Sequence, residues 1–157
     1  MQTLHSDLQA RLKKLAYRKS HAFCDPCNIQ VSGTHCELCH SDDLARGMAG
    51  WGVTWHIAEI IEHLISENLT PINVSEMFEE YIGQCYPETT TIGWMTYDTV
   101  SAMKELDPVS WRLAESEWLD QERSEGQVCT FDNESTYYLV SDVEDYLDEE
   151  ESEEGAA

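Results

Sequence analysis

Apolar residues recur every three or four positions along much of this chain, which is the spacing of amphipathic helices. The clearest example is the stretch 54–69, where an aliphatic stripe repeats at i, i+3, i+4, i+7 and i+8. The stripe consists of Ile57, Ile60, Ile61, Leu64 and Ile65. Residues 3–18 place leucines at a similar period, with basic side chains on the other face. The pattern predicts a helix in each stretch.

Capping residues mark further helices downstream. Asn73, followed three positions later by Glu76, is typical of a helix start, and Gly83 is placed to end that helix. Thr96 is expected to cap the next helix. Asp107-Pro108 then combines a capping carboxylate with a proline at the first helical position. The predicted inner face of this last helix carries Trp111, Ala114 and Trp118.

The end of the chain combines strand and helix signals. Residues 127–131 and 136–140 alternate around a turn at 132–135, which predicts a β-hairpin, and a short helix is expected through Val143 and Leu147. Helix, turn, helix, hairpin is the order of a winged helix. The second of these helices is acidic, however, whereas a DNA recognition helix needs donors for phosphates and base edges. A winged-helix-like end would therefore face a protein partner.

Four cysteines form two C-x-x-C pairs, Cys24/Cys27 and Cys36/Cys39, separated by eight residues. Each pair predicts a tight knuckle, and the spacer is long enough for a hairpin with Ser32-Gly33 at its tip that brings the pairs together. Four thiolates at tetrahedral corners suit zinc. Zinc is therefore the predicted cofactor, with a structural role, because four protein ligands leave no open position for water.

Other chemistries compete for the same cysteines. Residues 36–40 read C-x-x-C-H, the haem attachment pattern, but haem would leave the first pair without a role and would need an export signal that is not visible. A redox pair would want a βαβ setting, and disulfides an oxidising compartment. The histidines near the cysteines are His21, His35 and His40. We expect them to flank the site or donate hydrogen bonds to it, with replacement of one cysteine ligand by a histidine as the alternative.

This stretch resembles zinc-ribbon and zinc-knuckle modules. Such modules serve transcription factors, enzymes and adaptors alike, so the resemblance implies a folding role for the metal and no particular activity. The predicted fold class is mainly α with a small β component. The expected division is an N-terminal helix with a zinc-ribbon-like module (1–47), an acidic α-rich domain with a C-terminal hairpin (48–147), and a disordered acidic tail (148–157).

Charge is distributed unevenly along the chain. The net charge is −22. Residues 48–157 hold 26 Asp/Glu and three Lys/Arg, whereas residues 1–47 hold five Asp/Glu and six Lys/Arg. Such a field repels phosphates and lipid headgroups and attracts basic surfaces, so it disfavours direct binding of nucleic acid or membranes. No apolar run is long enough to span a bilayer, and we expect a cytoplasmic protein.

These features favour a non-enzymatic protein that binds a basic surface of a nucleic-acid-acting protein. Spaced carboxylates on helices can imitate the phosphate row of a duplex. In composition the chain is similar to the small acidic inhibitors carried by phages and mobile elements, and to immunity proteins. The candidate partner-binding residues are Glu115, Glu117, Asp120, Glu122, Asp142, Glu144 and Asp145.

Two alternatives stay open. A regulator could contact nucleic acid through the basic N-terminal module, using Lys13, Lys14, Arg18 and Lys19. An enzyme with an unfamiliar site could use His56, Glu59 and His63, although two helical turns separate the histidines, a span of about 10 Å. No P-loop, G-x-S-x-G or H-E-x-x-H motif is present. Cys85 and Cys129 are interpreted as ordinary buried thiols.

Overall fold

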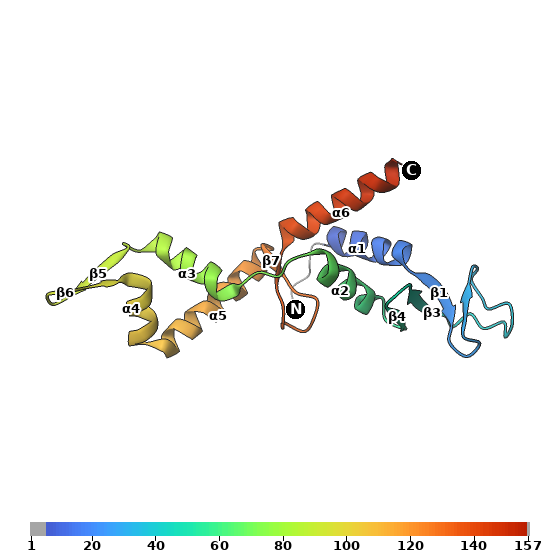
Figure 1. The fold of residues 1–157 in the computed structure, drawn as a ribbon, viewed down its shortest axis with the longest axis horizontal. Helices are drawn as coiled ribbons and strands as arrows, with labels where there is room; N and C mark the ends of the chain where they lie inside the picture. Colours follow the sequence, from blue (N-terminus) through green and yellow to red (C-terminus); the bar gives the residue numbers. More distant parts are fainter. Residues whose placement is uncertain (1–5, 157) are drawn as a thin grey trace.

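The computed structural model of the protein describes residues 6–156, which form six helices and three small antiparallel sheets (Figure 1). This confirms the prediction of a mainly α fold with a small β component. The helices are α1 (Ser6–Lys19), α2 (Ile57–Asn68), α3 (Val74–Cys85), α4 (Thr99–Leu106), α5 (Pro108–Ser124) and α6 (Val140–Gly155). The strands are β1 (His21–Cys24), β2 (Ile29–Val31), β3 (Ala45–Met48), β4 (Gly52–Thr54), β5 (Thr89–Ile92), β6 (Met95–Asp98), β7 (Val128–Cys129) and β8 (Tyr138–Leu139). Residues 3–5 of the first predicted helix lie outside the described residues.

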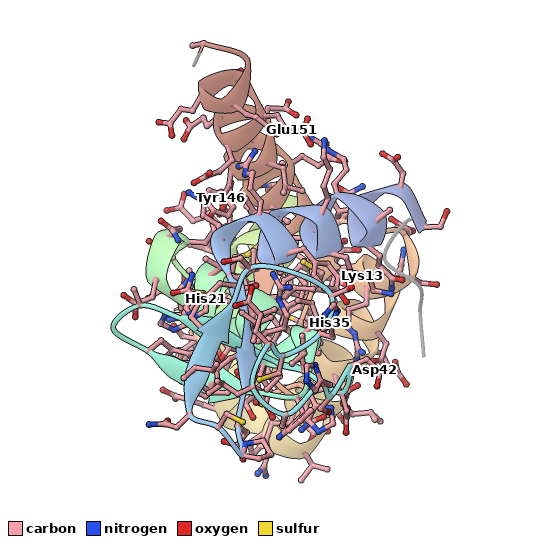
Figure 2. The ribbon with its side chains drawn as sticks, turned by 90° about the vertical axis from the view of Figure 1, so that its right-hand side faces the viewer. Lys13, His21, His35, Asp42, Tyr146 and Glu151 are labelled. Atoms are coloured by element: carbon pink, nitrogen blue, oxygen red, sulfur yellow. The ribbon has the colours of Figure 1, made fainter. Side chains whose placement is uncertain are left out.

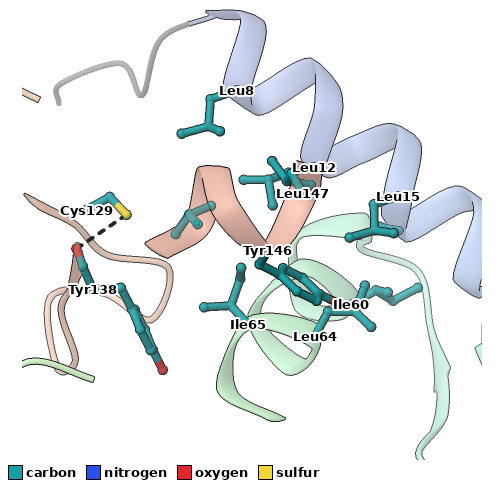
Figure 3. Close-up of a cluster of buried hydrophobic side chains, with 12 residues drawn as sticks. Leu8, Leu12, Leu15, Ile60, Leu64, Ile65, Cys129, Tyr138, Tyr146 and Leu147 are labelled. Atoms are coloured by element: carbon teal, nitrogen blue, oxygen red, sulfur yellow. Dashed lines mark hydrogen bonds between the residues drawn. The ribbon is translucent and has the colours of Figure 1, made fainter. Parts of the chain in front are cut away.

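The first helical core joins the two ends of the chain (Figure 3). Leucines of α1 pack against the aliphatic stripe of α2 and against Val143 and Leu147 of α6. The β7–β8 hairpin closes the same core, and the Cys129 thiol donates a hydrogen bond of 3.7 Å to the Tyr138 carbonyl oxygen. Helix α1 therefore packs with α2 and α6, although the cysteine stretch follows it directly in the sequence.

The second helical core is built by α3, α4 and α5. Its centre is Phe78, whose ring centroid lies 4.8 Å from that of Trp111 and 5.7 Å from that of Trp118. Ala114 is exposed, contrary to the prediction, because α5 contacts this core through a narrow stripe that holds its two tryptophans. This second lobe lies at the opposite end of the molecule from the β1–β4 sheet (Figure 1).

Two of the predicted helix caps are confirmed and two boundary predictions are wrong. The side chains of Asn73 and Asp107 each accept a hydrogen bond from the backbone N–H three residues further on. Helix α3 continues past Gly83 to its end two residues later. Thr96 lies within strand β6 because it pairs with β5, and Asp98 caps α4 instead. The hydrogen bond from the Ser101 N–H lowers the pKa of Asp98.

The elements of a winged helix follow one another in the chain, but they do not pack together as one. The buried hairpin residues Cys129 and Tyr138 lie in the first core, whereas Trp111 and Trp118 of α5 lie in the second. The segment between α2 and α3, which connects the two helical cores, is held to the β7–β8 hairpin, because the Ile72 N–H donates to the Tyr137 carbonyl oxygen at 2.8 Å.

The predicted disordered tail is instead helical, because α6 continues to Gly155. Its carboxylates pair with the basic face of α1, which offsets the repulsion among them. The pairs are Arg11–Asp148, Arg11–Glu151, Arg18–Glu150, Arg18–Glu154 and Lys19–Glu150, with N···O distances of 2.6–2.9 Å. The hydrogen bond from Arg11 lowers the pKa of Glu151. Residue 157 of the predicted tail lies outside the described residues.

Removing a side chain from the first core should destabilise the protein far more than the same change at the surface. We expect Ile65→Ala, at a residue that is 0% exposed, to lower the free energy of unfolding by about 2–5 kcal/mol. Ile92→Ala, at a residue that is 44% exposed, is the matched control and should change it by less than about 0.5 kcal/mol. Urea denaturation followed by circular dichroism measures both, and equal losses would contradict the assigned core.

Replacing Arg11 and Arg18 with glutamine should loosen the last turns of α6. Exposed ion pairs contribute only about 0–1 kcal/mol each, so we expect faster amide exchange in residues 148–155 and little change in residues 140–147, which the core holds. Hydrogen exchange measured by NMR tests this. Arg112→Gln is the control, because the Arg112 Nε donates to the Pro108 carbonyl oxygen and forms no ion pair with a described carboxylate. Unchanged exchange in the double variant would show that the ion pairs do not hold this segment.

Candidate metal centre

The four cysteines are positioned by a four-stranded antiparallel sheet with the order β2-β1-β3-β4. Cys24 pairs with Ile29 at the end of the β1–β2 hairpin, so the first knuckle is itself the hairpin turn. The predicted tip at Ser32-Gly33 is wrong, because residues 32–35 are bends that lead from β2 to the second knuckle. Strand β3 pairs with the other side of β1 and extends to Met48. The sheet therefore runs across the expected domain boundary after residue 47.

The two knuckles share one backbone design. The residue after each C-x-x-C pair has a positive φ, 53° at Asn28 and 62° at His40. Asparagine and histidine adopt this left-handed conformation more readily than most residues. The Asn28 N–H donates to the Asp25 carbonyl oxygen at 3.1 Å, and the His40 N–H donates to the Cys36 carbonyl oxygen at 2.8 Å. Each turn therefore folds back over its own pair of thiols.

The thiols converge on one point, as the sequence predicts. The four Sγ atoms all lie within 4.8 Å of one another, and those of Cys24 and Cys39 are 3.6 Å apart. Tetrahedral ligands at the usual Zn–S distance of about 2.3 Å stand about 3.8 Å apart, so the spacing fits a bound ion. Cys24 and Cys36 are fully buried, Cys27 is half-buried and Cys39 is exposed. All four are free thiols.

Hydrogen bonds and crowding shift the pKa values of these thiols in opposite directions. Backbone N–H groups, first that of Cys39 and also that of Leu38, lower the pKa of Cys36 to about 7. Contact with the Cys39 side chain, followed by burial, raises the pKa of Cys27 to about 12. Once Cys36 is ionised, a second thiolate beside it is thus disfavoured unless a cation offsets the negative charge. A divalent cation removes this repulsion, and coordination deprotonates the thiols.

The histidines near the site are not among its ligands. The convergent group of ligand atoms contains cysteine sulfurs alone. The His21 ring packs against Gly47, where an added Cβ would lie 2.7 Å from its Nε2. His35 lies, with Asp42, at the end of the molecule that carries the β1–β4 sheet, which faces the viewer in Figure 2. Among residues 6–156 the four cysteines are the one group that brings three or more potential ligands together.

A residue that the sequence does not single out, Arg46, fastens the sheet to α1. Its Nη2 donates to the carbonyl oxygens of Tyr17 and Ser20, both at 2.8 Å, at the C-terminal end of that helix. The guanidinium also lies 4.9 Å from the centroid of the Tyr17 ring. A cation at this end complements the helix dipole. The pairing of β3 with β1 places Arg46 here. No local sequence motif predicts this position.

The three residues of the candidate enzyme site lie in or beside α2. The Thr54 hydroxyl donates to the Glu59 carboxylate and accepts a hydrogen bond of 3.0 Å from the backbone N–H of His56. The His63 ring stacks on Trp51 with the centroids 5.1 Å apart. The side chains of Glu59 and His63 therefore have local contacts around α2, and the three residues do not form a group of potential metal ligands.

The predicted partner-binding carboxylates lie on two helices, four on α5 and three on α6. Glu117, Asp120, Glu144 and Asp145 are exposed, whereas Glu115, Glu122 and Asp142 are half-buried. The Ser75 hydroxyl donates to Glu115 at 3.3 Å, and Arg123 lies 3.8 Å from Asp120.

The two remaining cysteines differ from each other. Cys129 is buried, which raises the pKa of its thiol to about 12 and leaves it protonated. Cys85 is exposed, contrary to the prediction that it is a buried thiol. It is the last residue of α3, beyond the buried face formed by Phe78 and Ile82.

The geometry defines the class of site: four cysteines on two knuckles of a small antiparallel sheet, close enough together to hold a metal ion. No protein-family model, curated protein or solved structure matches this chain. None of the helices within residues 6–156 is long and apolar enough to cross a membrane.

Removing one ligand should abolish metal binding and unfold the sheet alone. We expect Cys36→Ser to lose its bound metal and the ordered NMR signals of residues 21–54, while the helices keep theirs because their cores do not include the cysteines of the site. Metal analysis and heteronuclear NMR measure this. Cys85→Ser is the control, with an unchanged metal content. Collapse of the whole chain in Cys36→Ser would contradict this independence of the helical cores.

Proposed function

We propose that this protein is a non-enzymatic interaction protein, stabilised by zinc, whose acidic surface binds a basic surface of a nucleic-acid-acting protein. It would act as an inhibitor or as a mimic of nucleic acid. The observation that carries the proposal is that most basic side chains of the described chain form ion pairs within the molecule. The acidic helix α6 already holds the basic face of α1, which leaves a surface dominated by carboxylates.

Zinc is supported by the ligand set and by the lack of another source of stability in the sheet. Thiolates suit zinc better than oxygen-preferring ions such as magnesium or calcium. The hydrophobic cluster of this region contains only Cys24, Cys36 and Val31 as buried members, with a few half-buried apolar neighbours. A core this small needs a metal or cross-links to stay folded. With four protein ligands the ion has a structural role.

The charge argument rests on named contacts. Arg11, Arg18 and Lys19 pair with α6, and Arg46 binds backbone carbonyl oxygens. In the second lobe, Lys104 pairs with Glu79, and Arg123 pairs with Glu134 at 2.8 Å. Most of the positive charge is thus neutralised internally. The exposed carboxylates of α5 and α6 remain, and rows of them at helical spacing offer arginine and lysine an anionic ladder.

These contacts also weaken the nucleic-acid alternative. Two of its four candidate residues, Arg18 and Lys19, are engaged by Glu150. Lys13 and Lys14 are exposed, but the helix that lies beside them is the acidic α6. Association with phosphates would have to displace these intramolecular pairs, whereas association with a basic protein would leave them in place.

Neutralising the α5 carboxylates should weaken capture of the partner. Affinity capture from the native host, identified by mass spectrometry, is expected to yield a nuclease, polymerase or other nucleic-acid-binding protein. This partner should dissociate at about 0.5 M salt, where exposed charges are screened. The variant combines Glu115→Gln, Glu117→Gln, Asp120→Asn and Glu122→Gln, and we expect it to retain little of the partner.

The control variant loses the same charge from exposed positions outside the second lobe and α6, through Asp7→Asn, Asp43→Asn, Glu62→Gln and Glu67→Gln. It should capture the partner nearly as well as the natural protein. Capture that does not depend on salt, or co-purification of nucleic acid with the protein alone, would contradict the proposal.

A further inference from the structure

The β5–β6 hairpin projects from the end of the second lobe, far from the metal centre (Figure 1). Its two-residue turn is Gly93-Trp94, and the φ of 64° at Gly93 is the conformation that such a turn needs. The register pairs Ile92 with Met95 and Thr90 with Tyr97. Alternation along the strands therefore gathers Ile92, Met95 and Tyr97 on one face. The Tyr97 hydroxyl lies 2.9 Å from the Met95 sulfur, which agrees with this arrangement.

The apolar side chains of this hairpin lie outside the hydrophobic cores of the described chain. Trp94 is 92% exposed, and Ile92, Met95 and Tyr97 are also exposed. None of the four belongs to a core cluster. A two-stranded hairpin without a core is marginally stable in water, and clustered exposed apolar residues mark interaction sites. The hairpin thus carries an apolar surface suited to a partner.

The base of the hairpin is held firmly enough to present this surface. Thr99, at the start of α4, is buried, and its backbone N–H donates to the Glu88 carbonyl oxygen at 2.9 Å. Its hydroxyl donates to the Pro87 carbonyl oxygen. These bonds join the two ends of the hairpin to each other at the start of α4, which belongs to the second lobe. An anchor that is already oriented loses less conformational entropy on binding.

The charge around the hairpin indicates which class of partner would be complementary to it. Residues 74–124 contain eleven Asp/Glu against three Lys/Arg, and Glu88 and Asp98 flank the base of the hairpin. A second copy of the chain would bring together two molecules of net charge −22, and lipid headgroups or nucleic acids would be repelled as well. A basic protein is the partner whose charge is complementary.

We propose that the β5–β6 hairpin is the apolar anchor of the interface, and that Trp94 inserts into an apolar patch bordered by lysine and arginine on a partner protein. This deepens the proposed function and rests on it. Tryptophan is among the residues that most often dominate binding energy at interfaces, and the acidic lobe would supply the charged rim.

Two synthetic helical peptides of equal lysine content test the proposal with the full-length protein. One carries a leucine stripe, and in the other glutamine replaces every leucine. Fluorescence anisotropy measures both affinities for the natural protein, for Trp94→Ala, and for Trp55→Ala as a matched exposed tryptophan remote from the hairpin. We expect Trp94→Ala to weaken binding of the leucine peptide about tenfold, to leave the glutamine peptide nearly unaffected, and Trp55→Ala to change neither.

Each other outcome overturns a distinct statement. If Trp94→Ala binds the leucine peptide as tightly as the natural protein does, the hairpin is not the anchor, while salt-sensitive binding of both peptides still supports the proposed function. If neither peptide binds, both proposals fail. If light scattering shows a dimer that Trp94→Ala converts to a monomer, the occupant is a second copy, and the assignment to a basic partner is wrong.

Discussion

The docking of α1 against both α2 and α6 is the contact on which the rest of the structure depends. Leu12 and Leu15 bury apolar surface, while Arg11 and Arg18 fix α6 alongside through ion pairs. Figure 2 shows Glu151 of α6 above the basic helix. The β1–β4 sheet is fastened to the C-terminal end of α1 through Arg46. The second lobe is inserted between α2 and β7, so both of its connections leave from this core.

The two ends of the molecule are stabilised by different physical means. The helical lobes bury aliphatic and aromatic side chains, for example Phe78 in contact with two tryptophans. The sheet at the other end has almost no apolar interior, and its convergent thiols take the place of a core. The helical cores and the sheet therefore rely on different contacts, which makes the cysteine cluster a local structural element.

Much of the fold can be predicted from the sequence where the signal is local. The stripe around Ile60 and Ile65, the caps at Asn73 and Asp107 and the C-x-x-C pairs all depend on neighbours within a few positions. The errors arise where a distant partner decides the outcome. Residues 148–155 are helical and pair with cations of α1 more than 100 positions away, since Arg11 and Asp148 are separated by 137 residues. Likewise Thr96 joins a strand because it pairs with Thr91.

The sharing of one core by the first and last helices has a consequence for synthesis. The leucines of α1 leave the ribosome before α6 is made, so this core cannot close until α6 has been translated. The knuckles and the second lobe are made of contiguous stretches and can fold earlier, because loops that close over short distances form faster. During that interval the arginines of α1 have no acidic helix beside them. The basic face of α1 therefore gains its intramolecular ion-pair partners only once the sixteen-residue helix α6 has been made.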